Sequence, residues 1–439
     1  MSRTEPQAFR ARILHFLDDP AKQGEAAWQY FEDGVLVVEQ GRVLAVGPAD
    51  ALLKGLDMPV ERFPDHLIIP GFIDCHIHYP QTEMIAAYGE QLLSWLNLYT
   101  FPTELKFSDS AYAAHVAGVF LDELLRNGTT TALVFGTVHP SAAEAFFAEA
   151  HRRGLRMIAG KVLMDRHAPE GLCDTPESGY SESRALIERW HGVGRLQYAV
   201  TPRFAPTSSP EQLAKAGELL AEFPDVYMHT HLAENLHEVQ WVKALFPEAA
   251  DYLDVYDRAG LLGRRSVFAH GVHLCDRQCE RLVQSGSAIA HCPTSNLFLG
   301  SGLLDLKKLR HHGVKVGLGT DVGAGTSFSL LRTMDEAYKI QQLRGEKLDA
   351  FQSLYMATLG GARALDLESK IGNFLPGKEA DFSILDLQAT PLLKFRLQHV
   401  HSLHELLFVL QTLGDDRLVE RTYAFGRCAH RRAQTGIGG

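Results

Sequence analysis

The feature that most constrains the fold is a regular alternation of short apolar runs and helix-like stretches through the middle of the chain. Eight such runs occur, and the segments between them have the apolar spacing of helices. The runs begin at Ile73, Thr129, Leu155, Leu196, Val226, Ser266, Ser287 and Val314. Repeated strand–helix alternation predicts an α/β fold with parallel strands, and eight strands close into a (β/α)₈ barrel of the TIM type. In such a barrel, functional side chains lie where the strands end.

The two ends of the chain have a different pattern. Residues 33–48 predict a β-hairpin around a Gln40–Gly41 turn, and residues 377–387 have the same strand-like character. Within the barrel region, residues 111–126 predict a helix. Ser141 with Glu144 predicts a capping box at the start of the next helix.

Bulk properties exclude several classes of function. The net charge is −10, and the 439 residues contain no run of Lys or Arg that could follow a phosphate backbone, so nucleic acid is not an expected partner. No stretch approaches the roughly 20 apolar residues of a membrane span, and the N-terminus lacks the features of a secretory signal. The six cysteines form no CxxC pair, so we expect neither a disulfide framework nor a thiolate zinc site. A reducing, cytoplasmic location fits this composition.

The first apolar run contains an HxH pattern. If residues 73–78 form a strand, the odd-numbered apolar residues share one face, and Asp74, His76 and His78 share the other. We expect the apolar face to pack against the helices. The two imidazoles would lie about 7 Å apart along the strand, close enough to bind one metal ion. A pair of hydrogen-bonded polar residues is the alternative interpretation of HxH alone.

The fifth run contains two further histidines, His229 and His231, which point the same way. His231 lies nearer the end of the strand and is the favoured ligand, but spacing alone leaves His229 as a second candidate. Glu234 follows in the loop, where it could reach the same space without binding the metal.

The sixth and eighth runs supply His270 and Asp321. Gly317 and Gly319 precede Asp321 on the same face, and such small residues let a ligand or a backbone segment approach closely. Alone, Asp321 could cap a turn and His270 could be an ordinary core histidine. Together, neutral imidazoles and one carboxylate suit Zn²⁺ and leave one coordination position open for water.

These residues together resemble the amidohydrolase superfamily, whose barrel members carry HxH on strand one, His on strands five and six, and Asp on strand eight. The segment Pro70–His78 resembles the family's entry into the barrel. The resemblance implies a small β-sandwich built from both termini, here residues 1–69 and 375–439, and a barrel over residues 70–374. It further implies one zinc ion per subunit, with metal ligands His76, His78, His231 and Asp321.

A narrower resemblance, to the guanine deaminases, extends over nearly the whole chain. It rests on His78–Glu104, Pro202–Thr207, His229–Asn235 and Gly319–Leu331. The third of these segments also favours His231 over His229, because the family's ligand lies three residues before the Glu.

That resemblance assigns roles to individual residues. Gln81, Arg203 and Phe204 would bind the purine alongside His231, and Glu234, His270 and Asp321 would be catalytic. Activated hydroxide would attack C2 of guanine and give xanthine and ammonia, as a step of purine catabolism in a cytoplasmic homodimer.

Some alternatives stay open at this point. A related mononuclear enzyme deaminating another purine, a pyrimidine or a triazine would share every metal ligand, and a non-catalytic scaffold could keep the barrel. Iron could replace zinc. Lys161 is interpreted as structural and not as the carboxylated lysine of binuclear relatives. Residues 88–107, with Trp95, Tyr99 and Phe101, are expected to cover the pocket or to contact a neighbouring subunit.

Overall fold

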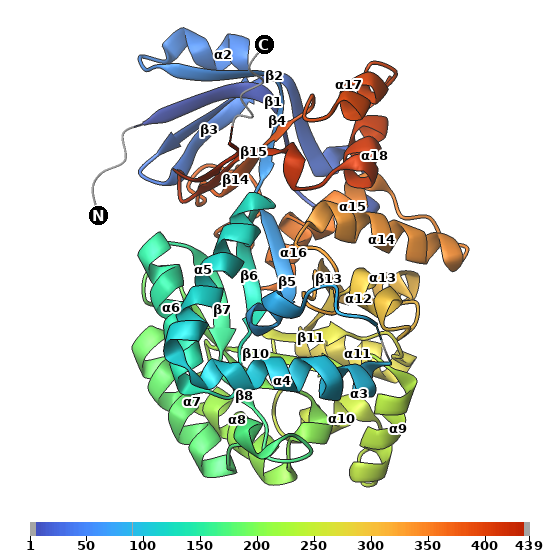
Figure 1. Cartoon of the computed structure of the whole chain (residues 1–439). Coiled ribbons are helices and arrows are strands. Elements are labelled where there is room, and N and C mark those ends of the chain that lie inside the picture. The colour runs from blue at the N-terminus through green and yellow to red at the C-terminus, as the bar shows by residue number, and fades with distance from the viewer. Residues whose placement is uncertain (1–5, 90, 434–439) are drawn as a thin grey trace.

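The computed structural model describes residues 6–89 and 91–433. Residues 1–5 and 434–439, at the ends of the predicted sandwich, and Glu90, in the predicted pocket cover, lie outside the described residues. Two sheets organise the molecule, a barrel sheet and a separate sheet made from the two ends of the chain (Figure 1).

The barrel sheet contains eight parallel strands in the order β13-β12-β11-β10-β9-β7-β6-β5. Their bounds are β5 Phe72–His78, β6 Thr129–Phe135, β7 Arg156–Gly160, β9 Gln197–Pro202, β10 Tyr227–Leu232, β11 Ser266–His270, β12 Ala288–His291 and β13 Lys315–Leu318, with the short β8 Val162–Leu163 beside β9. Each strand coincides with one of the eight predicted runs, although β5 begins one residue before its run, so the predicted barrel is confirmed.

The barrel closes between its first and last strands. The backbone N–H of Asp321 donates to His76 and the N–H of His78 donates to Val322, both at 2.9 Å. Inward-facing residues of the strands form an apolar cluster with residues 362–371, which begin in α16 and fill the amino-terminal end of the barrel. The interior is therefore a packed core, and only the carboxyl ends of the strands are free to hold a site.

The helices of the barrel surround its strands (Figure 1), except α16, which covers the amino-terminal end of the barrel. They are α5 Ser110–Arg126, α6 Pro140–Arg153, α7 Pro176–Trp190, α8 Pro210–Glu222, α9 Leu236–Leu245, α10 Tyr252–Arg258, α11 Asp276–Ser285, α12 Pro293–Phe298, α13 Leu306–His312, α14 Leu330–Leu343, α15 Ala350–Met356 and α16 Leu359–Ala364, with 3₁₀ turns η6 Glu170–Leu172 and η7 Ala205–Thr207. Short helical segments follow β5: η3 Tyr79–Met84, α3 Leu92–Trp95, the π-helical η4 Leu96–Thr100, α4 Phe101–Glu104 and η5 Leu105–Ser108.

The start of α6 differs from the prediction. Its N-cap is His139, which makes no side-chain capping bond, and Pro140 is the first helical residue. The predicted capping box of Ser141 and Glu144 is therefore wrong. Proline favours the first helical position because its fixed φ suits the helix and it has no N–H to leave unpaired.

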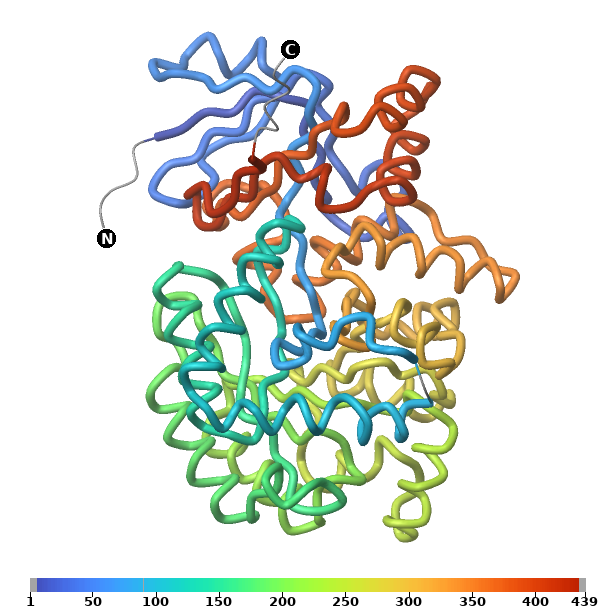
Figure 2. The backbone as a smooth tube through the Cα atoms, in the orientation of Figure 1, coloured from blue at the N-terminus to red at the C-terminus, as the bar shows by residue number. Residues whose placement is uncertain are grey.

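The terminal segments form one seven-stranded sheet in the order β16-β15-β14-β4-β1-β2-β3. The elements are β1 Gln7–Phe16, α1 Pro20–Gln23, η1 Gly24–Ala27, β2 Trp28–Glu39, β3 Arg42–Pro48, α2 Ala49–Leu52, η2 Leu53–Gly55, β4 Val60–Pro70, β14 Phe382–Asp386, α17 Pro391–Leu397, α18 Leu403–Leu413, η8 Asp416–Leu418, β15 Val419–Ala424 and β16 Arg427–Arg431. Figure 2 shows the chain leaving this sheet, tracing the barrel and returning to it.

The sheet curls around its own core. The ring of Phe9 on β1 lies 5.1 Å from that of Phe382 and 5.0 Å from that of Tyr423, although these come from strands on the other side of β4. The predicted hairpin is present, and Gln40 and Gly41 have φ of 51° and 78°, as a two-residue turn of type I′ requires.

The part of the chain after the barrel is not purely β. Helices α17 and α18 precede β15, and α18 lies against α14 and α15, beside the barrel (Figure 1). The division at residues 69/70 and 374/375 stays a prediction. Within the described residues, no helix has the length and apolar character needed to cross a membrane.

Candidate metal centre and active site

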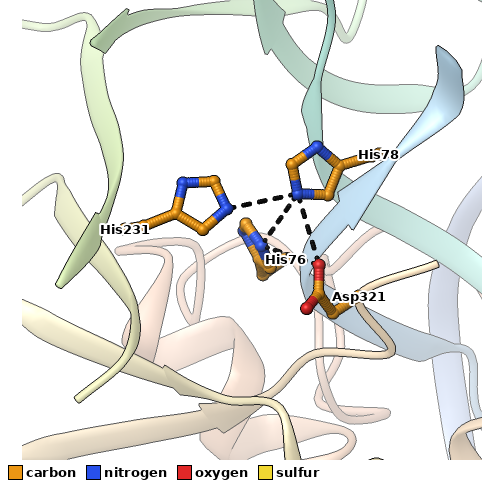
Figure 3. Close-up of side chains that lie close together, drawn as sticks. All are labelled: His76, His78, His231 and Asp321. Atoms are coloured by element: carbon orange, nitrogen blue, oxygen red, sulfur yellow. Dashed lines mark hydrogen bonds and ion pairs between the residues drawn. The ribbon is translucent and has the colours of Figure 1, made fainter. Parts of the chain in front are cut away.

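Four predicted side chains meet at the carboxyl ends of the barrel strands (Figure 3). His76 and His78 come from β5, His231 from β10, and Asp321 from the turn after β13. Asp321 Oδ1 lies 3.1 Å from Nε2 of His76 and 3.2 Å from Nε2 of His78. The Nε2 atom of His78 lies 3.2 Å from that of His76 and 3.3 Å from that of His231.

These separations fit a tetrahedral metal ion. Ligand atoms 2.0–2.1 Å from a zinc ion at tetrahedral angles lie about 3.3 Å apart. The protonation of His231 also fits, because its Nδ1 lies 2.7 Å from the carbonyl oxygen of Arg203. A carbonyl only accepts, so Nδ1 carries the hydrogen and the lone pair of Nε2 faces the group.

A second grouping, His76, His270, Cys292 and Asp321, also lies within reach of one ion. Burial raises the pKa of the Cys292 thiol well above its usual value, which disfavours the thiolate that a metal requires. The group with three imidazoles is therefore the better candidate.

Burial sets the charges of the group. It lowers the pKa of His78 to about 4 and the pKa of His231 well below its usual range, so both imidazoles are neutral and have a free lone pair. For Asp321, burial alone would raise the pKa. The closeness of His76 and His78 outweighs burial, so the pKa of Asp321 is well below normal and the charged carboxylate is favoured.

The strand that supplies HxH does not alternate as predicted. Its pairing with β6 shifts between Asp74 and Ile77, so Cys75 and His76 together oppose one residue of β6. Ile73 and Cys75 belong to the cluster inside the barrel, whereas Ile77 packs under the helices. The prediction that all three apolar residues face the helices is wrong for Ile73 and Cys75.

His229 and His231 have distinct positions. Nε2 of His229 lies 2.8 Å from Nδ1 of His76, on the side of that ring away from the metal group. His229 is completely buried and is outside the group that could bind a metal. It contacts a candidate ligand instead of acting as one.

Glu234 and His270 lie beside the metal group. Nε2 of His270 is 3.4 Å from Glu234 Oε2 and 3.8 Å from Asp321 Oδ2. Burial, reinforced by the charge of Asp321, raises the pKa of Glu234 well above its usual value. Burial lowers the pKa of His270 to about 3. At neutral pH His270 is therefore uncharged, and burial favours the protonated form of Glu234.

Every residue predicted for the site except His76 lines one pocket next to the metal group. Its apolar wall includes Leu92, Trp95 and Leu96 from α3 and η4, so part of the 88–107 segment covers the pocket. Phe101 lies behind that wall, with its ring 5.6 Å from the guanidinium of Arg203.

The polar end of the pocket is held from behind. Nη1 of Arg203 donates to both carboxylate oxygens of Glu104, at 2.7 and 3.0 Å. Gln81 donates to Glu104 through Nε2 at 3.4 Å, and its Oε1 accepts from the N–H of Gly323 at 3.1 Å. These contacts fix how both side chains face the pocket.

Lys161 lies apart from the metal group. It is fully buried, and its Nζ pairs with Asp174 at 2.5 Å and with Glu182 at 3.2 Å. These ion pairs agree with the interpretation of Lys161 as structural.

Comparison with known proteins places this site in a family. The family model described as "Amidohydrolase family" matches residues 67–427. A curated guanine deaminase of Escherichia coli is 54% identical over 96% of each chain. The chain belongs to the guanine deaminase group of the amidohydrolases. Like other amidohydrolases, it is a metal-dependent hydrolase that acts on C–N bonds.

Solved structures of guanine deaminases have the same fold as this amidohydrolase. The E. coli enzyme covers 97% of this chain and 100% of its own, with a TM-score of 0.95 and 52% identity. A C. acetobutylicum enzyme with bound guanine covers 97% and 100%, with a TM-score of 0.86 and 28% identity.

Sequence reasoning missed three polar residues around the site of this amidohydrolase. Glu104 holds Arg203 and Gln81, Ser301 donates to Glu234 Oε1 at 3.0 Å, and the amide of Asn296 lies 2.9 Å from Nδ1 of His270. None of the three belongs to a ligand pattern. Only Glu104 had a signal, because it ends the segment His78–Glu104 that resembles the guanine deaminases.

Proposed function

We propose that this chain hydrolyses guanine to xanthine and ammonia, with one Zn²⁺ per subunit. The observation that carries the proposal is a single pocket in which three features meet: the metal-binding group, the carboxyl of Glu234, whose burial favours its protonated form, and two anchored side chains with N–H donors. A role in purine catabolism, a cytoplasmic location and a homodimer are parts of the same proposal.

His76, His78, His231 and Asp321 are the residues that would hold the zinc. When bound, zinc would act as a Lewis acid and activate the attacking water at neutral pH. Three neutral nitrogens and one carboxylate leave the net positive charge that this activation needs.

Arg203 and Gln81 bind the ring. Guanine presents two acceptors, O6 and N7, on one edge, and both side chains have N–H groups that match them. Phe204 completes the contact with the ring. Since both polar side chains are anchored by Glu104 and Gly323, the ring is held in one orientation.

Glu234 and Asp321 move the protons. Glu234 gives its proton to ring N3 as water adds to C2, which makes C2 more electrophilic. Asp321, with His270 beside it, takes a proton from the attacking water. Transfer of that proton to the exocyclic nitrogen lets the C2–N bond break and ammonia leave. The remaining hydrogen of the added water passes from the C2 hydroxyl to Glu234 as the C2 carbonyl forms, so one water is consumed and Glu234 and Asp321 return to their starting states.

Glu234→Gln tests this assignment. The amide keeps the size of the side chain but cannot carry the proton, so we expect ammonia release from guanine to fall by about 10²–10⁴-fold. Bound zinc, measured by elemental analysis, should be unchanged. Turnover close to that of the unchanged chain would remove Glu234 from the mechanism. Ammonia release from adenine, cytosine and an aminotriazine, assayed in parallel, tests the choice of guanine.

A further inference from the structure

Glu104 is a fully buried carboxylate at the end of α4, behind the polar wall of the pocket. It does not line the pocket, but both side chains it contacts, Arg203 and Gln81, do. A buried charge is stable only if it is paired and hydrogen-bonded, so these contacts are persistent.

The contacts of Gln81 determine which way its amide points. A side-chain amide can present either its oxygen or its NH₂ group. Here the N–H of Gly323 can only donate, and the carboxylate of Glu104 can only accept. The oxygen of Gln81 must therefore face Gly323 and its nitrogen must face Glu104. One N–H of Gln81 remains uncommitted.

Arg203 is held in the same manner. Only Nη1 of its guanidinium donates to Glu104, and Phe101 lies under the group. The other guanidinium nitrogens are not used by Glu104, and Arg203 has donors only. Glu104 thus orients Arg203 and Gln81 so that both present N–H donors at this end of the pocket. Its own carboxylate does not line the pocket.

We propose that Glu104 is a positioning residue that sets ring specificity, by holding Arg203 and Gln81 as donors for a purine with an oxo group at C6. A purine with an amino group at C6 would place a donor against these donors. This inference rests on the proposed function, which it extends to the choice between 6-oxo and 6-amino rings.

Glu104→Gln replaces the carboxylate, which can only accept from Gln81 and Arg203, by an amide of nearly the same volume. A glutamine at this position can offer Gln81 either a donor or an acceptor, so only the contact with Gly323 still orients the amide of Gln81, and Arg203 loses its charged partner. We expect KM for guanine to rise about tenfold with kcat changed less than threefold. The preference for guanine over 2,6-diaminopurine, as a ratio of kcat/KM, should fall at least tenfold.

Glu379→Gln is the matched control. Glu379 is also a buried carboxylate that holds two arginines, Arg156 and Arg195, but it lies at the junction with the terminal sheet. It should lose stability without a change in the preference ratio. If Glu104→Gln does not fold, Glu104→Asp keeps the charge but shortens the reach to Gln81, and its ratio should fall at least threefold.

Binding measurements test the role of Glu104 independently of the proposed function, which is tested by ammonia release. Trp95 lines the pocket, so quenching of tryptophan fluorescence reports Kd for guanine and for 2,6-diaminopurine when Glu104→Gln and its parent are compared in a Glu234→Gln background, in which turnover is slowed. No ammonia from guanine with the unchanged chain would overturn the proposed function, and the Kd ratio would still test Glu104. A Kd ratio in Glu104→Gln equal to that of the unchanged chain overturns the role of Glu104.

Discussion

His229 and His231 lie two residues apart on the same strand, yet only His231 points a ring nitrogen into the metal-binding group. His229 contacts Nδ1 of His76 from behind. When Nε2 of His76 binds the metal, its Nδ1 carries the hydrogen and donates to His229. Such a partner fixes the tautomer and the orientation of a ligand, and so affects metal affinity without touching the metal.

We predict that His229→Leu weakens zinc binding about 10–100-fold, because His76 loses the acceptor that orients it. His229→Gln keeps an oxygen that can accept from His76 Nδ1 and should retain most of the affinity. Competition with a chromophoric chelator measures both. Equal zinc affinity in the leucine variant and the unchanged chain would show that the contact has no such role.

The closing strands β5 and β13 show how an element positions ligands. A methyl group added at Gly319 would lie 2.9 Å from Cβ of His76 and 3.0 Å from its carbonyl oxygen, and one at Gly317 would lie 2.4 Å from Sγ of Cys75. These glycines therefore let the last strand approach the first. This close approach allows the barrel to close between β13 and β5, and it also brings Asp321 next to His76.

We predict that Gly319→Ala displaces β5, lowers the free energy of unfolding by about 1–3 kcal/mol and reduces bound zinc. Gly55→Ala is the control, since a methyl group there meets nothing within 4 Å. Urea unfolding and zinc analysis of both purified variants check this. A Gly319→Ala protein with normal zinc content would show that β5 is not held in place by this contact.

At the scale of the whole molecule, the chain must return from the barrel to the sheet in which it began. His15 on β1 is part of this junction: its Nδ1 accepts from the N–H of Phe374 at 3.4 Å, and its Nε2 donates to Oε1 of Gln29 at 3.1 Å. The contact with Phe374 requires the neutral ring, because a protonated Nδ1 cannot accept. Burial, with a smaller contribution from Lys378, lowers the pKa of His15 to about 4.

His15 should therefore make the fold sensitive to acid. In the unfolded chain its pKa is about 6.5, so between pH 6.5 and 4 the unfolded state binds a proton that the folded state does not. Stability falls over this window, by up to about 3 kcal/mol from His15 alone. Urea unfolding at pH 7 and pH 4 should show a smaller fall in His15→Gln. Equal falls in both proteins would contradict this assignment.

Local patterns in the sequence were sufficient for the barrel, for the hairpin at Gln40–Gly41 and for the residues that meet around the metal. Apolar periodicity and turn chemistry act within a few residues, and the carboxyl ends of parallel strands share one edge. The position of His231 nearer the end of the strand favoured it over His229, and the family resemblance decided the choice, since both histidines have the same spacing.

Only the tertiary structure decided the rest. The register shift at Cys75–His76 depends on the neighbouring strand β6, so strict alternation could not predict it. The contacts of Glu104 with Arg203 and of His229 with His76 join residues about a hundred or more positions apart. Such pairings arise because buried charges and ring nitrogens must find partners in the folded interior, and no local pattern encodes which partner that is.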